Sequence, residues 1–195
     1  MQTLDVVNEM LGTQGFRPLA SLTEPHAFRG AAQSTLTRVN RAIQAKGWWF
    51  NREPLTLQPS AVDSAIYLPG DTINVRHALA KYVQRGGRLY NTELGDYTFE
   101  ASVDVILIRL IPFEDLPELA ATHISATAVL EYQLNYDGDT AKTRKLEDRI
   151  DKDGKGTLAD LQSEEIRSSR VNLINSNARL QQLKSITRAA RSLLR

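Results

Sequence analysis

The sequence predicts an α+β fold, a helical bundle built from both ends of the chain and packed with a central, mainly antiparallel β-sheet region. Apolar residues recur every three or four positions near both ends and every second position in the middle. A Gly-Gly pair in that middle part is typical of a hairpin loop. The 195 residues therefore divide into N-terminal helices over 1–47, a sheet region over 48–111, and C-terminal helices with a basic arm over 112–195. We expect the three parts to form one domain.

Two helices are predicted before the sheet region. The first is a short helix with one apolar face, which stops at a group of glycines and a proline: Leu4, Val7, Met10, Leu11, then Gly12, Gly15 and Pro18. For the second helix, Thr23 is a possible N-cap, Pro25 lies in the first turn, and Gly47 is placed as a C-terminal cap. Its apolar face is marked by Phe28, Ala32, Leu36, Val39 and Ile43.

Short apolar runs between Pro and Gly turns predict the strands. They are expected near Trp48–Asn51, Leu55–Leu57, Ala65–Leu68, Thr72–Arg76, Tyr82–Arg85, Arg88–Asn91 and Val103–Leu110. Gly86-Gly87 supplies the positive φ angles of a two-residue hairpin loop. Val105–Ile108 is continuously apolar, which predicts burial on both faces of the sheet.

Helix returns after Pro112 and Pro117. Its predicted register follows Leu119, Ala120, Ile124, Thr127, Leu130, Glu131 and Leu134 over about five turns. Asp137–Asp139 breaks it, Thr140–Ile150 is expected to be a charged and largely exposed helix, and Asp151–Gly156 is a second break. The last 39 residues are expected to be helical, with Leu173, Leu180 and Leu183 on one face.

Composition argues against several classes of protein. The chain has no cysteine, and its three histidines (His26, His77 and His123) are far apart in sequence, so no metal site is predicted. His123 is expected at a core edge or an interface. Phosphate-binding glycine motifs are missing, so no cofactor is expected either. The longest purely apolar run is far shorter than the roughly 20 residues of a membrane span, and no signal sequence is recognised, which predicts a soluble protein that does not bind membranes.

Charge is divided unevenly along the chain. Residues 166–195 hold seven of the 24 basic side chains and no acid, which leaves 17 basic against 23 acidic side chains in the other 165 residues. The candidate partner-binding residues are Arg167, Arg170, Arg179, Lys184, Arg188, Arg191 and Arg195. This basic arm has no aromatic residue to stack on bases, so contact with an acidic protein surface is favoured over DNA binding or a merely solvated helix. We expect Asn172–Arg195 to order only on assembly.

Two catalytic or metal-binding alternatives were weighed. Asp151–Leu158 resembles the start of a calcium-binding EF-hand loop, but Lys155 stands at a ligand position and Gln162 replaces the bidentate glutamate, so a solvated linker is preferred. A glycan hydrolase needs two carboxylates across a cleft, about 5 to 10 Å apart. Glu114, Asp115 and Glu118, with Asp104 on a strand, are the candidates, although acids at a helix start ordinarily cap it.

The helix and aromatic turn Arg38–Asn51 resemble the tail tubular protein A family of short-tailed bacteriophages. Two further stretches are similar to the family in the right order: Leu4, Val7, Asn8 and Leu11 with Gly15, Pro18, Ser21 and Leu22, and Ile108–Leu110 with Glu114, Leu116, Pro117 and Glu118. The resemblance covers roughly residues 1–136, whereas the charged segment 142–156 and the basic arm depart from it.

The resemblance implies a structural virion protein rather than an enzyme. Its implied place is a dodecameric ring, assembled in the host cytoplasm, at the head-to-tail junction of the tail. That ring would connect the portal protein to the nozzle protein (tail tubular protein B), contact the tail fibre, and frame the channel through which double-stranded DNA is ejected without sequence-specific binding. An auxiliary hydrolase acting on capsule or cell-wall glycan is the alternative function.

Overall fold

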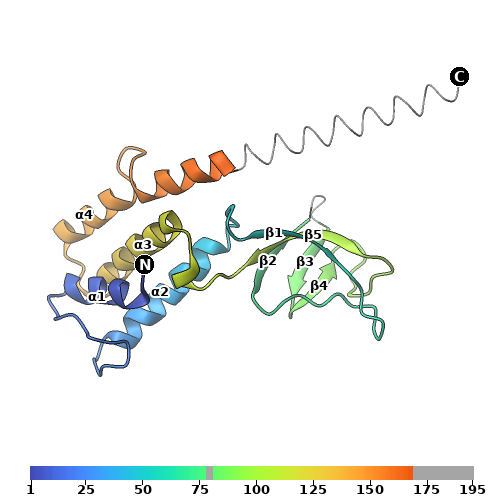
Figure 1. Ribbon diagram of the computed structural model, residues 1–195, viewed down its shortest axis with the longest axis horizontal. Helices are drawn as coiled ribbons and strands as arrows, with labels where there is room; N and C mark the ends of the chain where they lie inside the picture. Colours follow the sequence, from blue (N-terminus) through green and yellow to red (C-terminus); the bar gives the residue numbers. More distant parts are fainter. Residues whose placement is uncertain (78–80, 169–195) are drawn as a thin grey trace, which may run out of the picture.

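The computed structural model describes residues 1–77 and 81–168 and confirms the α+β class. The molecule is elongated, with helices at one end and strands at the other (Figure 1). We call residues 3–44 and 113–168 the helical body and residues 52–109 the sheet body. The elements are α1 (Thr3–Thr13), α2 (Arg29–Gln44), β1 (Arg52–Leu57), β2 (Thr72–Arg76), β3 (Tyr82–Arg85), β4 (Arg88–Asn91), β5 (Val103–Arg109), η1 (Phe113–Asp115), α3 (Glu118–Tyr136) and α4 (Thr140–Ile150). Residues 157–168 are also helical.

The helical body packs α1, α2 and residues 157–168 around α3 over one apolar core, which includes Met10, Leu36, Trp48, Tyr132 and Leu161. The predicted face of α3 was partly wrong, because Leu119 and Leu134 are 39% and 53% exposed. The buried side of α3 is instead rich in small residues: Ala120, Ala121, Ile124, Ser125, Ala126, Ala128 and Val129. Small side chains let neighbouring helices approach α3 closely on several sides, which a single apolar stripe does not predict.

The predicted start of α2 was also wrong. The helix begins at Arg29 rather than near Thr23. The carboxylate of Glu24 explains this, because it accepts hydrogen bonds from the backbone NH of Ala20 (2.7 Å) and from Arg17 (2.7 Å). These contacts hold the segment before Arg29 as a looped connection.

The sheet body contains an antiparallel three-stranded sheet in the order β1-β5-β2 and a separate β3-β4 hairpin. The hairpin closes at Gly86-Gly87, with φ angles of 55° and 73°, as predicted. Two predicted strands were wrong. Trp48–Asn51 forms a turn, because the Asn51 side chain accepts the backbone NH of Trp48, and Ala65–Leu68 makes only isolated bridges.

The central strand β5 is not buried on both faces, contrary to the prediction. Val105 and Leu107 point into the inner core of the sheet body, whereas Ile106 on the outer face is 40% exposed. Ile108 is fully buried because the helical body covers only that end of the outer face. Gly47, at φ 71°, allows this approach, since a Cβ there would lie 2.5 Å from the Ile108 Cδ1.

Two buried amide side chains join the bodies at the waist. Gln44 accepts the backbone NH of Ile111 (2.9 Å) and donates to its carbonyl (2.8 Å). Asn51 donates to the carbonyls of Gln44 and Arg109, both at 2.9 Å. The chain crosses the waist twice, and each amide binds the backbone of the other crossing.

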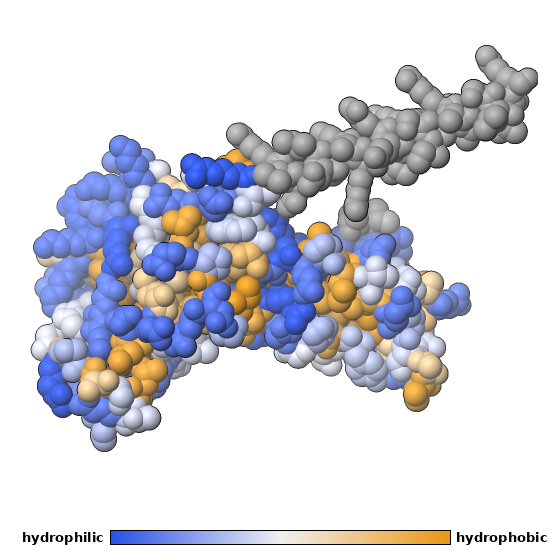
Figure 2. All heavy atoms as spheres, viewed as in Figure 1, coloured by the Kyte–Doolittle hydropathy of each residue, from blue (hydrophilic) through white to orange (hydrophobic). Residues whose placement is uncertain are grey.

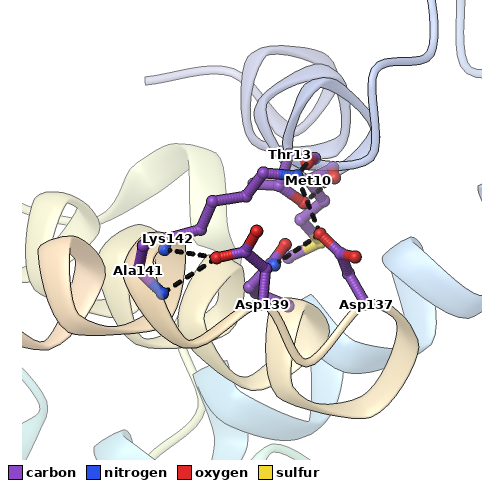
Figure 3. A network of polar contacts seen from close by, with 7 residues as sticks. Met10, Thr13, Asp137, Asp139, Ala141 and Lys142 are labelled. Carbon is purple, nitrogen blue, oxygen red and sulfur yellow. Dashed lines mark hydrogen bonds and ion pairs between the residues drawn. The ribbon is translucent and has the colours of Figure 1, made fainter.

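One ammonium group ties α4 to its neighbours (Figure 3). Lys142 donates to the carbonyl of Thr13 at the end of α1 and to the Asp137 carboxylate after α3, both at 2.8 Å. Asp139 caps α4 by accepting the backbone NH groups of Ala141 and Lys142. The predicted bounds of this charged helix are confirmed, and Thr143 is its buried residue.

The connection after α4 is a tight turn rather than a metal-binding loop. Lys152 and Lys155 exchange two backbone hydrogen bonds (2.7 and 2.9 Å) around Asp153 and Gly154, which both have positive φ angles. Helix resumes at Thr157, so the connection is far shorter than the 12 residues of an EF-hand loop.

Residues 157–168 are fastened to the helical body at three points. His123 is 5% exposed, and its Nδ1 lies 3.0 Å from the Thr157 hydroxyl oxygen. Leu161 is fully buried. Glu165 accepts the backbone NH of Trp49 (2.8 Å) and pairs with Arg52 at the start of β1. The predicted core-edge position of His123 is thus confirmed, and the helix ends against the waist.

Replacing the waist amide by Asn51→Ala is expected to lower the free energy of unfolding by about 2–4 kcal/mol, because buried NH and carbonyl groups lose their partners. Urea denaturation measures the loss as a lower midpoint at unchanged slope. The exposed Asn135→Ala is the matched control, expected within about 0.5 kcal/mol of wild type. Equal effects from both variants would contradict the assigned role of Asn51.

Stability is expected to fall at mildly acidic pH because of His123. Burial lowers its pKa below the ordinary 6.5, and the charge of Lys46 lowers it further. The unfolded chain therefore binds this proton more readily, so the contribution is complete above about pH 6.5 and is lost as pH falls toward the folded pKa, at no more than about 1.4 kcal/mol per pH unit. Urea denaturation between pH 7.5 and 5 should show a shallower slope for His123→Gln. An unchanged slope would exclude His123 as its source.

Candidate assembly surfaces

The outer face of the three-stranded sheet forms a shallow hollow of about 480 Å³. We call this hollow the open sheet face; it is lined by Pro54, Leu55, Thr56, Arg76, His77, Asp104, Val105 and Ile106. Pro54, Ile106 and Arg76 occupy one cross-strand row, so their side chains lie on the same side of the sheet. Thr56 donates to the Asp104 carboxylate at 2.5 Å on one side of this row. The floor is apolar and the edges are charged.

A loop at the end of the sheet body holds an apolar side chain in solvent. Val62 is 95% exposed at the tip of residues 60–65, which we call the Val62 loop. The backbone NH of Ser60 donates to Ala65 O (2.8 Å), and that of Ser64, at φ 57°, donates to Ser60 O (2.9 Å). Figure 2 shows a hydrophobic projection at the lower right, where Figure 1 places this teal loop. The loop is fixed by hydrogen bonds while its apolar tip stays uncovered.

Asp63 beside Val62 is an exposed carboxylate held by neutral donors. It accepts hydrogen bonds from the Tyr67 hydroxyl (2.7 Å) and the backbone NH of Ala65 (3.1 Å). These two hydrogen bonds, in that order, lower the pKa of Asp63. The carboxylate is therefore charged at neutral pH.

The far end of the helical body carries a partly exposed aromatic cluster. Phe16 stacks on Phe28 with ring centroids 5.3 Å apart, and Tyr136 meets Phe28 edge-on at 6.1 Å. Phe16 and Tyr136 are 37% and 47% exposed. Figure 2 shows apolar side chains gathered there, at the lower left. Aromatic residues are enriched at protein interfaces, which makes this cluster a second candidate surface.

The basic arm is described at its first residue alone. The Arg167 side chain is 78% exposed and lies 3.5 Å from Glu164. The other predicted residues lie outside the described part of the chain: Arg170, Arg179, Lys184, Arg188, Arg191 and Arg195. Leu173, Leu180, Leu183 and the segment Asn172–Arg195 lie outside it too. The described helix fixes where the arm begins, beside the waist.

The predicted carboxylates do not meet across a cleft. Glu114 accepts the backbone NH of Thr3 (3.4 Å), and Glu118 lies 3.8 Å from the N-terminal ammonium group. Asp104 is the one carboxylate of the open sheet face. A second hollow at the waist contains Glu53 and Asp71, and both pair with Arg109 (2.7 and 2.6 Å). Neither hollow presents the opposed pair of unpaired acids that glycoside hydrolysis uses.

Sequence reasoning missed the Val62 loop and the open sheet face. Val62 stands alone in the polar stretch Ser60–Ser64, and single exposed apolar residues are ordinary on protein surfaces. Its exposure and the order of its loop become visible only in the structure. Within residues 1–77 and 81–168, no three potential ligands gather as a metal site, and no helix is long and apolar enough to cross a membrane.

Comparison with known proteins agrees with the resemblance in the sequence. Residues 4–183 match the family described as Tail tubular protein. The chain is 30% identical to Tail tubular protein A of Klebsiella phage KP34 over 137 residues, which covers 69% of this chain and 73% of that protein. This chain therefore belongs to the tail tubular protein family and is a structural component of a bacteriophage tail.

Proposed function

We propose that the chain forms the ring-shaped head-to-tail adaptor of a short-tailed phage, between the portal and the nozzle protein, with tail-fibre contacts at its periphery. The observation that carries the proposal is the family match over residues 4–183. Residues 1–195 would act as one adaptor domain, and twelve copies would frame the channel for the leaving DNA. This role is assembly, and no side chain needs to perform a reaction.

The arrangement of surfaces supports ring formation. A closed ring of identical subunits needs two different, complementary faces on each subunit. The open sheet face and the Val62 loop are two such faces in the sheet body, and the aromatic cluster lies at the opposite end of the molecule. Further surfaces thus remain for proteins above and below the ring.

The charge of the chain also fits a DNA channel. Outside residues 166–195 there are 17 basic and 23 acidic side chains, a net charge of −6. DNA is itself densely negative, and dense positive charge would retain it. A net negative body is suited to letting DNA pass without binding.

Mixing the purified protein with the portal ring of the same phage is expected to give one heavier particle whose added mass corresponds to twelve copies. Native mass spectrometry and negative-stain images would measure the stoichiometry and the ring shape. A portal that binds no copy across a range of salt concentrations would refute the adaptor role.

The basic arm is proposed to contact an acidic surface of a partner in the tail. Its residues would be Arg167, Arg170, Arg179, Lys184, Arg188, Arg191 and Arg195. The double variant Lys184→Glu with Arg188→Glu is expected to weaken portal binding about tenfold, because like charges then face each other. The matched control, Arg144→Glu with Lys145→Glu on the exposed side of α4, makes the same change in net charge.

Sedimentation at two salt concentrations separates the outcomes. Weaker binding by the arm variant, with a reduced dependence on salt, is the expected result. An equal loss in both variants would show an effect of overall charge and would count against the arm as a specific contact.

A further inference from the structure

We propose that the Val62 loop of one copy docks on the open sheet face of the next copy in the ring, with Val62 against Pro54 and Ile106 and Asp63 beside Arg76. The inference rests on the proposed ring and names its contact between subunits. It follows from four features of the described residues: a fixed apolar projection, an apolar hollow, their positions on the sheet, and their charges.

The projection is built to stay exposed in the free subunit. Ser64 holds a left-handed conformation that costs a non-glycine residue conformational energy. Its carbonyl also accepts the backbone NH of Phe99 (2.9 Å), and Ala65 bridges Thr98, which fixes the loop against the sheet body. A fixed loop loses little conformational entropy when it binds. Val62 is therefore presented to a partner instead of folding back onto its own chain.

The hollow offers a matching apolar floor. Pro54, Leu55 and Ile106 are exposed although they belong to the central part of the sheet. Pro54 lies on the edge strand β1 and has no backbone NH, which makes an added β-strand along β1 less suitable than a side-chain contact. A branched aliphatic side chain from a loop suits this floor.

The two surfaces lie on opposite sides of the three-stranded sheet. The Val62 loop leads into Ile66, which packs in the inner core with Val105 and Leu107. The row of Pro54, Ile106 and Arg76 faces the other way. A loop on one side cannot reach the hollow on the other side of its own sheet, so the contact joins two copies head to tail and can close a ring.

Charge selects the Val62 loop over the neighbouring apolar tip at Leu94. Asp63 and Arg76 are both exposed, and among the described residues neither has an oppositely charged partner. Arg76 donates only to the backbone carbonyl of Lys46, which leaves its charge uncompensated. In the Leu94 loop, Glu93 already pairs with Lys81 at 2.8 Å. Only the Val62 loop brings a free acid next to its apolar tip.

Disulfide trapping tests the contact, because the chain has no cysteine. Val62→Cys and Ile106→Cys are made in separate chains, mixed in equal amounts, assembled on the portal ring and oxidised. The expected product on a non-reducing gel is a dimer that needs both variants. The control pair Leu94→Cys with Ile106→Cys should not form it. Thr56→Cys replaces Ile106→Cys as the acceptor if the latter fails to fold.

The outcomes separate the two proposals. Rings that form without the Val62–Ile106 disulfide would overturn the docking contact and leave the adaptor role intact, and so would a dimer of Val62→Cys alone. A portal that binds no wild-type chain would overturn both.

A charge exchange gives an independent reading. Asp63→Arg and Arg76→Asp are each expected to lower ring formation about tenfold, and the double variant is expected to restore it in part. Restoration would not follow if the two residues acted separately, so a double variant as weak as the single ones would contradict the pairing.

Discussion

The buried amides of Gln44 and Asn51 are the contacts on which the arrangement of this molecule depends. The helical and sheet bodies have separate apolar cores, so apolar packing alone would leave their relative orientation poorly determined. The amides bind backbone groups of the two crossings, and hydrogen bonds between buried groups are directional and costly to break. Every surface at the far end of the sheet body is placed relative to the helices through this junction.

Local sequence signals predicted most of the elements. Gly86-Gly87, the bounds of α4 and the strands β2 to β5 follow from turn chemistry and short-range periodicity. The errors arose where distant contacts decide the outcome. Trp48–Asn51 has the composition of a strand, but the Asn51 amide turns it toward Arg109, which is 58 residues away. Ile106 and Ile108 look alike in sequence, and only the position of the helical body makes one exposed and the other buried.

The candidate surfaces were harder to predict than the fold. An assembly protein has no catalytic motif, so charge was the main signal in the sequence, and it pointed to the basic arm. The Val62 loop has no such signal, because its distinctive property is exposure combined with a hydrogen-bonded backbone. Both properties depend on Tyr67 and Phe99, which are brought to the loop by folding.

The position of β5 determines how the molecule bears mechanical load. It is the central strand, bonded on one side to β1 and on the other to β2, and it continues directly into the waist crossing at Leu110. Hydrogen bonds in an antiparallel sheet run perpendicular to the strands. Tension applied along β5 therefore shears both ladders at once instead of peeling their bonds apart one by one. A subunit built in this way transmits a pull between its two ends through its strongest direction.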